Sequence, residues 1–205
     1  MINKISKARQ FNNLTKISKF DNKNVLSYNK WPIEWKTVYY KAYPRFEQVI
    51  PPAPSSNNFN LYEILLKRES FRDFSNKPIK LDTLSDLLYY SIGMKKILNN
   101  KSTNSRMYPS AGGRYPIEVY PFIFNVSQLQ QGVYHYHFKT HSLETLLQKP
   151  ILEEVVKQIQ MPWTKKSGML LVTSAVFDRN EMKYGDRGYR HILTEYGHLA
   201  QNVYL

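Results

Sequence analysis

Apolar residues recur along this chain with two different periods, which together predict a mixture of helices and strands. Spacings of three and four residues predict a short helix over 61–67, helices over 81–93 and 151–158, and a long amphipathic helix over 187–205. In the second of these, Asp82 is the expected N-cap and Gly93 the expected end.

Apolar runs predict three strands, over residues 117–126, 132–138 and 168–177. The first contains Pro121, which lacks a backbone donor and therefore predicts an edge strand or a bulge. The second is expected to have one wet face that carries His135 and His137, with His141 just beyond it. The third is apolar throughout and is expected to be buried. These elements predict the α+β class.

Residues 1–50 are polar, aromatic and irregular. Their aromatic side chains cluster towards the end of the segment, at Trp31, Trp35, Tyr39, Tyr40, Tyr43 and Phe46. This stretch is too aromatic for a disordered tail, so we expect it to pack on something. Residues 50–58 follow as a proline-rich and polar linker. We therefore expect an N-terminal extension and linker over 1–58 and one domain over 59–205.

The formal net charge is +13, and residues 1–50 contribute about half of it, with ten Lys and Arg against three Asp and Glu. A basic surface attracts phosphate-bearing partners. The sequence nevertheless shows no basic recognition helix and no RNA-binding aromatic strand, so we expect no nucleic-acid partner. A solvated basic face is the favoured interpretation, and an acidic protein partner or a peptide substrate stays open.

The chain contains no cysteine, which excludes disulfides, thiolate nucleophiles and cysteine metal sites, and which fits a cytoplasmic protein. No apolar run is long enough to predict a membrane span. The basic start of the chain lacks the apolar segment of a secretory signal. We therefore expect a cytoplasmic protein without a membrane partner.

Arg68, Ser70 and Arg72 stand at every second position, so in extended backbone their side chains would point the same way. Two guanidiniums with a hydroxyl between them make a good clamp for a phosphate, because arginine offers planar bidentate donors. From this stretch alone, an exposed charged segment after a helix is the favoured interpretation.

Small and turn-forming residues gather ahead of a strong strand in the loop Arg106-Met107-Tyr108-Pro109-Ser110-Ala111-Gly112-Gly113-Arg114-Tyr115-Pro116. The run from Ala111 to Gly113 lets the backbone come within hydrogen-bonding reach of a flat ligand, because no side chain larger than a methyl group intervenes. Prolines stiffen both ends of the loop, and Ser110 adds a hydroxyl. A simple tight turn is the alternative, but it would use one or two glycines and not this whole array.

The stretch from Pro109 to Gly113, followed by 115–120, resembles the flavin-contacting loop of the FMN-dependent nitroreductase superfamily, and more narrowly that of the SagB-type (McbC-like) azoline dehydrogenases. This resemblance implies that the isoalloxazine ring of FMN lies against Pro109, Ser110, Ala111, Gly112 and Gly113. The run 68–74 resembles the phosphate-binding segment of the same family. With the resemblance, a phosphate clamp made by Arg68, Ser70 and Arg72 becomes the favoured interpretation.

Three further stretches, 8–16, 183–190 and 195–205, are similar to segments of these dehydrogenases in the same order. The family converts azolines to azoles, in which the ring loses a proton from carbon and a hydride to the flavin. The resemblance assigns the proton transfer to Lys183 and Tyr184. It further implies a peptide substrate made by ribosomes, cyclodehydratase subunits as partners, and a flavin site at a homodimer interface.

The family fold is a central mixed or antiparallel sheet flanked by helices, and in the family the chain continues past the last helix. This sequence ends at Leu205 inside that helix, so we expect a C-terminally truncated domain that lacks the C-terminal elements. Two other functions stay open. One is an NAD(P)H-dependent nitroreductase-like enzyme acting on small aromatics, and the other is a non-catalytic scaffold subunit of a peptide-modifying complex.

His198 lies three residues after Glu195 on the predicted last helix, where the two side chains can touch. Metal sites on helices use duplicated pairs of this kind, and the sequence has only one, so we expect no metal. We expect His198 to pack on the core or on the flavin pocket.

Overall fold

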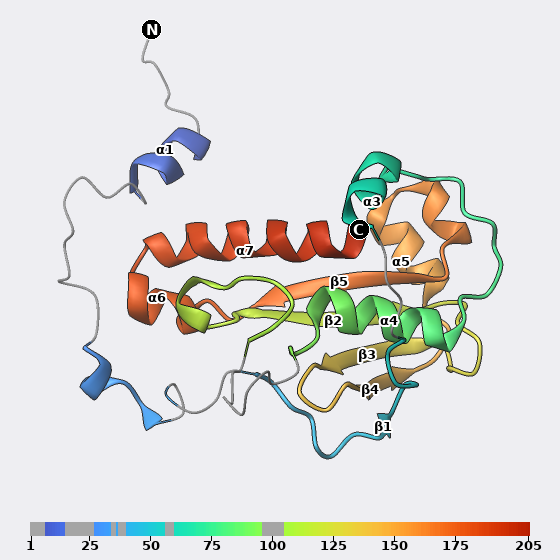
Figure 1. Cartoon of the computed structure of the whole chain (residues 1–205), viewed down its shortest axis with the longest axis horizontal. Coiled ribbons are helices and arrows are strands. Elements are labelled where there is room, and N and C mark those ends of the chain that lie inside the picture. The colour runs from blue at the N-terminus through green and yellow to red at the C-terminus, as the bar shows by residue number, and fades with distance from the viewer. Residues whose placement is uncertain (1–6, 15–26, 34–35, 37–39, 56–59, 96–104) are drawn as a thin grey trace, which may run out of the picture.

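The structure is a computed structural model that describes residues 7–14, 27–33, 36, 40–55, 60–95 and 105–205. Five strands form one antiparallel sheet in the order β1-β4-β3-β2-β5 (Figure 1). The strands are β1 (Gln48–Val49), β2 (Ile117–Ile123), β3 (Gly132–His137), β4 (Ser142–Gln148) and β5 (Met169–Ala175). The three predicted strands are confirmed as β2, β3 and β5, whereas β1 and β4 were not predicted.

The helices are α1 (Lys7–Leu14), α3 (Leu61–Lys67), α4 (Leu81–Ile92), α5 (Leu152–Ile159), α6 (Asp178–Tyr184) and α7 (Arg187–Tyr204). Short 3-10 turns occur at η1 (Tyr28–Lys30), η2 (Ala111–Gly113) and η3 (Pro162–Lys166). The four predicted helices are confirmed as α3, α4, α5 and α7, whereas α1 and α6 were not predicted. Within the described ranges, none of the helices is long and apolar enough to cross a membrane.

One face of the sheet packs against α4 and α7, which lie along the strands (Figure 1). The core side chains on the helices are Leu84, Leu88, Ile92 and Leu199. Those on β2 are Ile117, Val119 and Ile123, which alternate along the strand. Packing of this face therefore fixes α7 over β2, the strand that leaves the loop 106–116.

The opposite face of the sheet carries a buried charged cluster in place of the expected wet face. His135 on β3 lies between two carboxylates, with Nδ1 2.7 Å from Glu144 Oε2 and Nε2 3.1 Å from Glu118 Oε2. All three residues are at most 2% exposed. His137 is also buried, and His141 is half-buried and bonds Ser85 and Tyr136. The prediction of a wet strand face is therefore wrong.

The N-terminal segment covers this face, which explains the error. The backbone N–H of Lys41 donates to Glu118 Oε1 at 3.1 Å, and that of Tyr43 donates to Glu144 Oε1 at 2.7 Å. The Tyr43 ring packs edge-on against His135, with ring centroids 5.0 Å apart. The expectation that this aromatic segment packs on something is confirmed for its described part, whereas Trp35 and Tyr39 lie outside the described residues.

Three local predictions are corrected. Lys80, whose side chain makes no capping hydrogen bond, occupies the N-cap of α4. Asp82 lies in the first turn, where its negative charge interacts favourably with the helix dipole. Pro121 lies on an interior strand, paired with Leu171 of β5. Pairing with β3 starts one residue later, so the missing donor falls where that ladder ends. β5 is a half-buried edge strand and not a buried one.

Candidate functional site

The loop 106–116 is closed on itself around a buried arginine. The Arg106 backbone N–H donates to the Tyr115 hydroxyl at 3.0 Å, and its Nη1 donates to Tyr108 Oη and to the Ile117 carbonyl. The guanidinium lies 3.7 Å from the centroid of the Phe138 ring, a cation–π contact. These contacts tie both ends of the loop to the sheet and give it a fixed shape.

At Gly112 the loop lies close to the end of α6. Its φ is +64°, a left-handed conformation that favours glycine. A Cβ added there would lie 2.7 Å from the Tyr184 hydroxyl and 2.8 Å from Lys183 Nζ. The structure therefore brings the two candidate proton-transfer residues to the candidate flavin loop. Gly113 has the same φ, but a Cβ there would meet nothing within 4 Å.

Lys183 and Tyr184 form the last turn of α6, which Gly185 ends with a φ of +53°. Lys183 is exposed and Tyr184 is half-buried. The Lys183 ammonium lies 5.5 Å from the Tyr184 ring centroid, and the Tyr184 ring packs edge-on against His191 of α7. The two functional groups thus share one small region beside Gly112, and Lys183 can reach solvent or a bound ligand.

Two arginines clamp α6 to the loop. Arg179 Nη1 donates to the Tyr115 carbonyl at 2.9 Å and lies 2.6 Å from Glu118 Oε1. Arg114 Nε donates in return to the Arg179 carbonyl at 2.9 Å. Because both arginines are buried, these bonds hold α6 in a fixed position relative to the loop.

Behind the loop, Ser110 hydrogen-bonds a buried carboxylate, Glu195, that was not among the predicted site residues. The Ser110 hydroxyl donates to Glu195 Oε2 at 2.6 Å and accepts the Tyr115 backbone N–H at 2.8 Å. Burial raises the pKa of Glu195 to about 7, although the Ser110 bond and the charges of Arg106 and Arg179 oppose the shift.

Glu195 points inward from α7, and His198 is exposed. The prediction that His198 packs on the core is therefore wrong, whereas packing on the flavin pocket stays a prediction. The available signal was the helical period, because Gly188, Ile192 and Leu199 are the buried positions that flank Glu195 on the same stripe. A carboxylate on such a stripe is an unusual core residue, and this marks it as a candidate for function.

Arg68, Ser70 and Arg72 lie in the exposed segment that follows α3. In Figure 1 this segment runs around the end of the molecule that holds α3 and α5, whereas the loop 106–116 lies at the other end beside α6. Within one chain, the structure therefore does not bring the candidate phosphate clamp to the candidate flavin loop.

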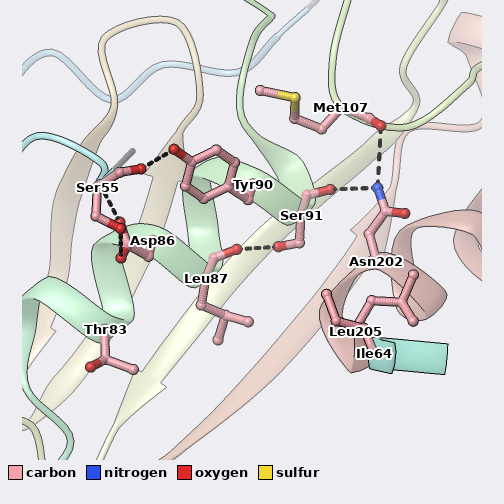
Figure 2. Close-up of a pocket in the computed structure, with 10 residues that line it drawn as sticks. All are labelled: Ser55, Ile64, Thr83, Asp86, Leu87, Tyr90, Ser91, Met107, Asn202 and Leu205. Carbon is pink, nitrogen blue, oxygen red and sulfur yellow. Dashed lines mark hydrogen bonds between the residues drawn. The ribbon is translucent and has the colours of Figure 1, made fainter. Parts of the chain in front are cut away.

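A cavity of about 570 Å³ lies between α3, α4 and the end of α7, and Met107 at the start of the loop lines it (Figure 2). The Asn202 side-chain amide donates to the carbonyls of Ser91 and Met107, at 3.3 and 3.2 Å. At the far wall, Ser55 donates twice to the Asp86 carboxylate. The Asn202 bonds hold the start of the loop against α4 and α7.

Residues 65–205 match the sequence model of the nitroreductase family. A protein of Methanocaldococcus jannaschii named "Putative nitroreductase MJ1384" is 32% identical over 153 residues. The match covers 74% of this chain and 75% of that protein.

Solved structures share the fold at lower identity. Two are named as putative nitroreductases. The one from Anabaena variabilis has a TM-score of 0.70 and 21% identity, and the match covers 95% of this chain. The one from Ralstonia eutropha has a TM-score of 0.57 and 23% identity, and the match covers 77% of this chain. The third is the Escherichia coli microcin synthetase McbBCD complex with truncated pro-MccB17 bound. It has a TM-score of 0.54 and 22% identity, and the match covers 96% of this chain. This chain spans 38%, 69% and 75% of their lengths.

Proposed function

The chain belongs to the nitroreductase family of oxidoreductases, and from that premise we propose that it is an FMN-dependent dehydrogenase that oxidises azolines to azoles in a ribosomally made peptide. The observation that carries the proposal is the packing of Lys183 Nζ and Tyr184 Oη against Gly112. It places two groups that can transfer a proton beside a loop whose backbone a flat ring can approach.

The residues present fit FMN. At Gly113 the loop leaves open space, with nothing within 4 Å of the position that a Cβ would take, so a flat ring can approach the backbone there. The exposed run with Arg68, Ser70 and Arg72 offers donors that suit a phosphate. Bound FMN would supply a hydride acceptor.

The positions of these two parts favour a site completed by a second copy of the chain. Because one chain holds the phosphate clamp and the ring loop at different ends, a homodimer that brings the clamp of one protomer to the loop of the other would assemble both. Exposed apolar side chains on the outer side of α7, at Leu193, Tyr196 and Tyr204, support such an interface.

The protein side of the reaction is proton transfer. Oxidation of an azoline requires that one ring carbon lose a proton while a hydride leaves from its neighbour. We assign proton acceptance to Lys183 Nζ or Tyr184 Oη, whose tips meet at the Gly112 contact. The clamp by Arg114 and Arg179 holds α6, whose last turn carries both groups, against the loop.

The peptide substrate is supported by the fold shared with the McbBCD complex, in which truncated pro-MccB17 is bound. Cyclodehydratase subunits, as partners that make the azoline, belong to the same proposal. The second candidate is an NAD(P)H-dependent nitroreductase acting on small aromatics, which the name of the M. jannaschii relative favours. A scaffold subunit without catalysis is a third outcome that the experiments below separate.

FMN binding is the first test. We expect the purified chain to be yellow or to take up added FMN, and to bind FMN more tightly than riboflavin, because only FMN offers a phosphate to Arg68 and Arg72. Fluorescence titration measures both affinities. Arg72→Ala is expected to remove most of the preference for FMN, whereas Arg45→Ala, an exposed arginine outside the clamp, is expected to keep it. A colourless protein that does not bind added FMN would contradict the proposal.

Substitution of the proton-transfer pair separates the three functions. Lys183→Ala and Tyr184→Phe are each expected to keep FMN but to lower the rate of azole formation by about 10²- to 10⁴-fold, the usual contribution of a general acid or base. Mass spectrometry of the peptide measures this rate. Lys157→Ala, an exposed lysine on α5, is the matched control. Consumption of a nicotinamide would indicate the nitroreductase, and unchanged complex function in both variants would indicate a scaffold.

Gly112→Ala is expected to damage activity more than stability. Its Cβ would displace the side-chain ends of Lys183 and Tyr184 and no backbone atom, and the positive φ costs about 1 kcal/mol. We therefore expect a small fall in the free energy of unfolding and a fall in turnover comparable to that of Lys183→Ala. Gly113→Ala has the same φ and no such contact, so it should cost similar stability and keep the proton-transfer geometry.

A further inference from the structure

Glu195 occupies a core position on α7. The buried stripe of this helix runs through Gly188, Ile192 and Leu199, and Glu195 lies between the last two at 2% exposure. Its Oε1 is buried and has no hydrogen-bond partner among the described residues. A carboxylate in such a place is costly, so its presence calls for an explanation.

Charged and titratable groups face Glu195 from the loop and from α6. Arg106 on the loop and Arg179 on α6 favour its ionised form. The pKa of Tyr108 on the loop is raised by burial and further by the charge of Glu195. On its own helix, His191 is half-buried and His198 is exposed. Burial outweighs the two arginines and raises the pKa of Glu195 to about 7, so both forms of the carboxyl group are accessible near neutral pH.

Ser110 connects this carboxyl group to the loop. A serine hydroxyl has one hydrogen and two lone pairs, and one lone pair of Ser110 already accepts the Tyr115 N–H. When Glu195 is ionised, the Ser110 hydrogen is committed to Oε2. When Glu195 is neutral, its own O–H can donate to Ser110, and the Ser110 hydrogen is then free to turn towards a ligand on the loop.

We propose that Glu195 is a proton-linked positioning residue that takes up one proton from solvent when the flavin on the loop is reduced and releases it on reoxidation. This inference rests on the proposed FMN site. The two electrons come from the substrate hydride, and the carboxylate of Glu195 gains one proton to become a carboxylic acid. Added negative charge on the ring favours the neutral form of Glu195, which lets Ser110 donate to the ring.

The test is the midpoint potential of FMN bound to the full chain, measured from about pH 6 to about pH 9. Above about pH 7, we expect the equilibrium constant for reduction to fall up to tenfold more per pH unit in the wild type than in Glu195→Gln. For a two-electron couple this extra slope is about 30 mV per pH unit. Glu153→Gln, an exposed glutamate on α5, should keep the wild-type slope.

Ser110→Ala is the second variant, which keeps Glu195 but removes the relay, and it should lose the extra slope as well. Infrared titration of the flavin-free protein adds an independent measurement, because a protonated carboxyl band that disappears near pH 7 should be absent from Glu195→Gln. FMN binding with the same pH slope in wild type, Glu195→Gln and Ser110→Ala overturns this inference alone. Failure to bind FMN overturns both this inference and the proposed function.

Discussion

Replacing Arg179 by methionine is expected to lower the free energy of unfolding by about 3–5 kcal/mol, because it leaves a buried carboxylate without its nearest cation. Arg179 Nη1 lies 2.6 Å from Glu118 Oε1, and both side chains are at most 10% exposed. Burial alone would raise the pKa of Glu118, but the bond to His135 and the charge of Arg179 hold it below its usual value. Urea denaturation at neutral pH measures the loss.

A surface ion pair provides the control for Arg179→Met. Lys149 and Glu154 also form a close pair, with Nζ 3.2 Å from Oε1, but both side chains are about half exposed or more. Lys149→Met should therefore cost less than about 1 kcal/mol. Arg179→Lys, which keeps the charge but loses the planar fork, should fall between the two variants. Equal losses for Arg179→Met and Lys149→Met would contradict the assignment of a buried pair.

The second large effect is a pH dependence of stability that comes from Glu195. Its pKa is about 7 in the folded chain against 4.5 as the ordinary value, so the folded state keeps a proton that the unfolded state releases. The associated stability is fully present below pH 4.5 and is lost as the pH rises through about 7. At 1.36 kcal/mol per pKa unit, the total is about 3 kcal/mol.

Glu195→Gln isolates this contribution, because glutamine has no proton to release. The difference in the free energy of unfolding between Glu195→Gln and wild type should shift by about 3 kcal/mol in favour of the variant between about pH 4.5 and about pH 8. Denaturant titrations at a series of pH values measure it, and other titrating groups cancel in the difference. Glu153→Gln should track the wild type, and parallel curves for Glu195→Gln would mean that Glu195 titrates normally.

The fold class and the main helices were predictable because local periodicity determines them. The period of α7 gave its position along the chain but not which side chains face the core. Leu193 and Tyr196 are apolar but about half exposed, whereas the charged Glu195 faces inward. Hydrophobicity alone does not distinguish an exposed apolar face of a helix from a buried face that contains a charged residue.

The wet face expected on β3 failed for a different reason. Alternation predicts which side chains share a face, and His135 and His137 do share one. What covers that face depends on residues about 90 positions earlier, Tyr40 and Tyr43, whose contacts no local pattern encodes. The same applies to Arg179, whose ion pair with Glu118 joins α6 to β2.

The candidate site divides along similar lines. The small residues around Gly112 predicted that another group lies close to the loop backbone. The resemblance supplied Lys183 and Tyr184, whose side-chain ends lie at that glycine in the structure. The link from Ser110 to Glu195 joins positions 85 residues apart, and it was visible only as a polar residue on an apolar stripe. The phosphate assignment of Arg68, Ser70 and Arg72 stays a prediction.

The position of β1 has a consequence for any shortened form of the chain. β1 pairs with β4 and forms one edge of the sheet, although it lies before residue 65, where the family match begins. Removal of residues 1–58 would bare the backbone donors and acceptors of β4 and let water reach His135 and its two carboxylates. A bare strand of this kind is a template for pairing with other chains, so the shortened protein would be prone to aggregate.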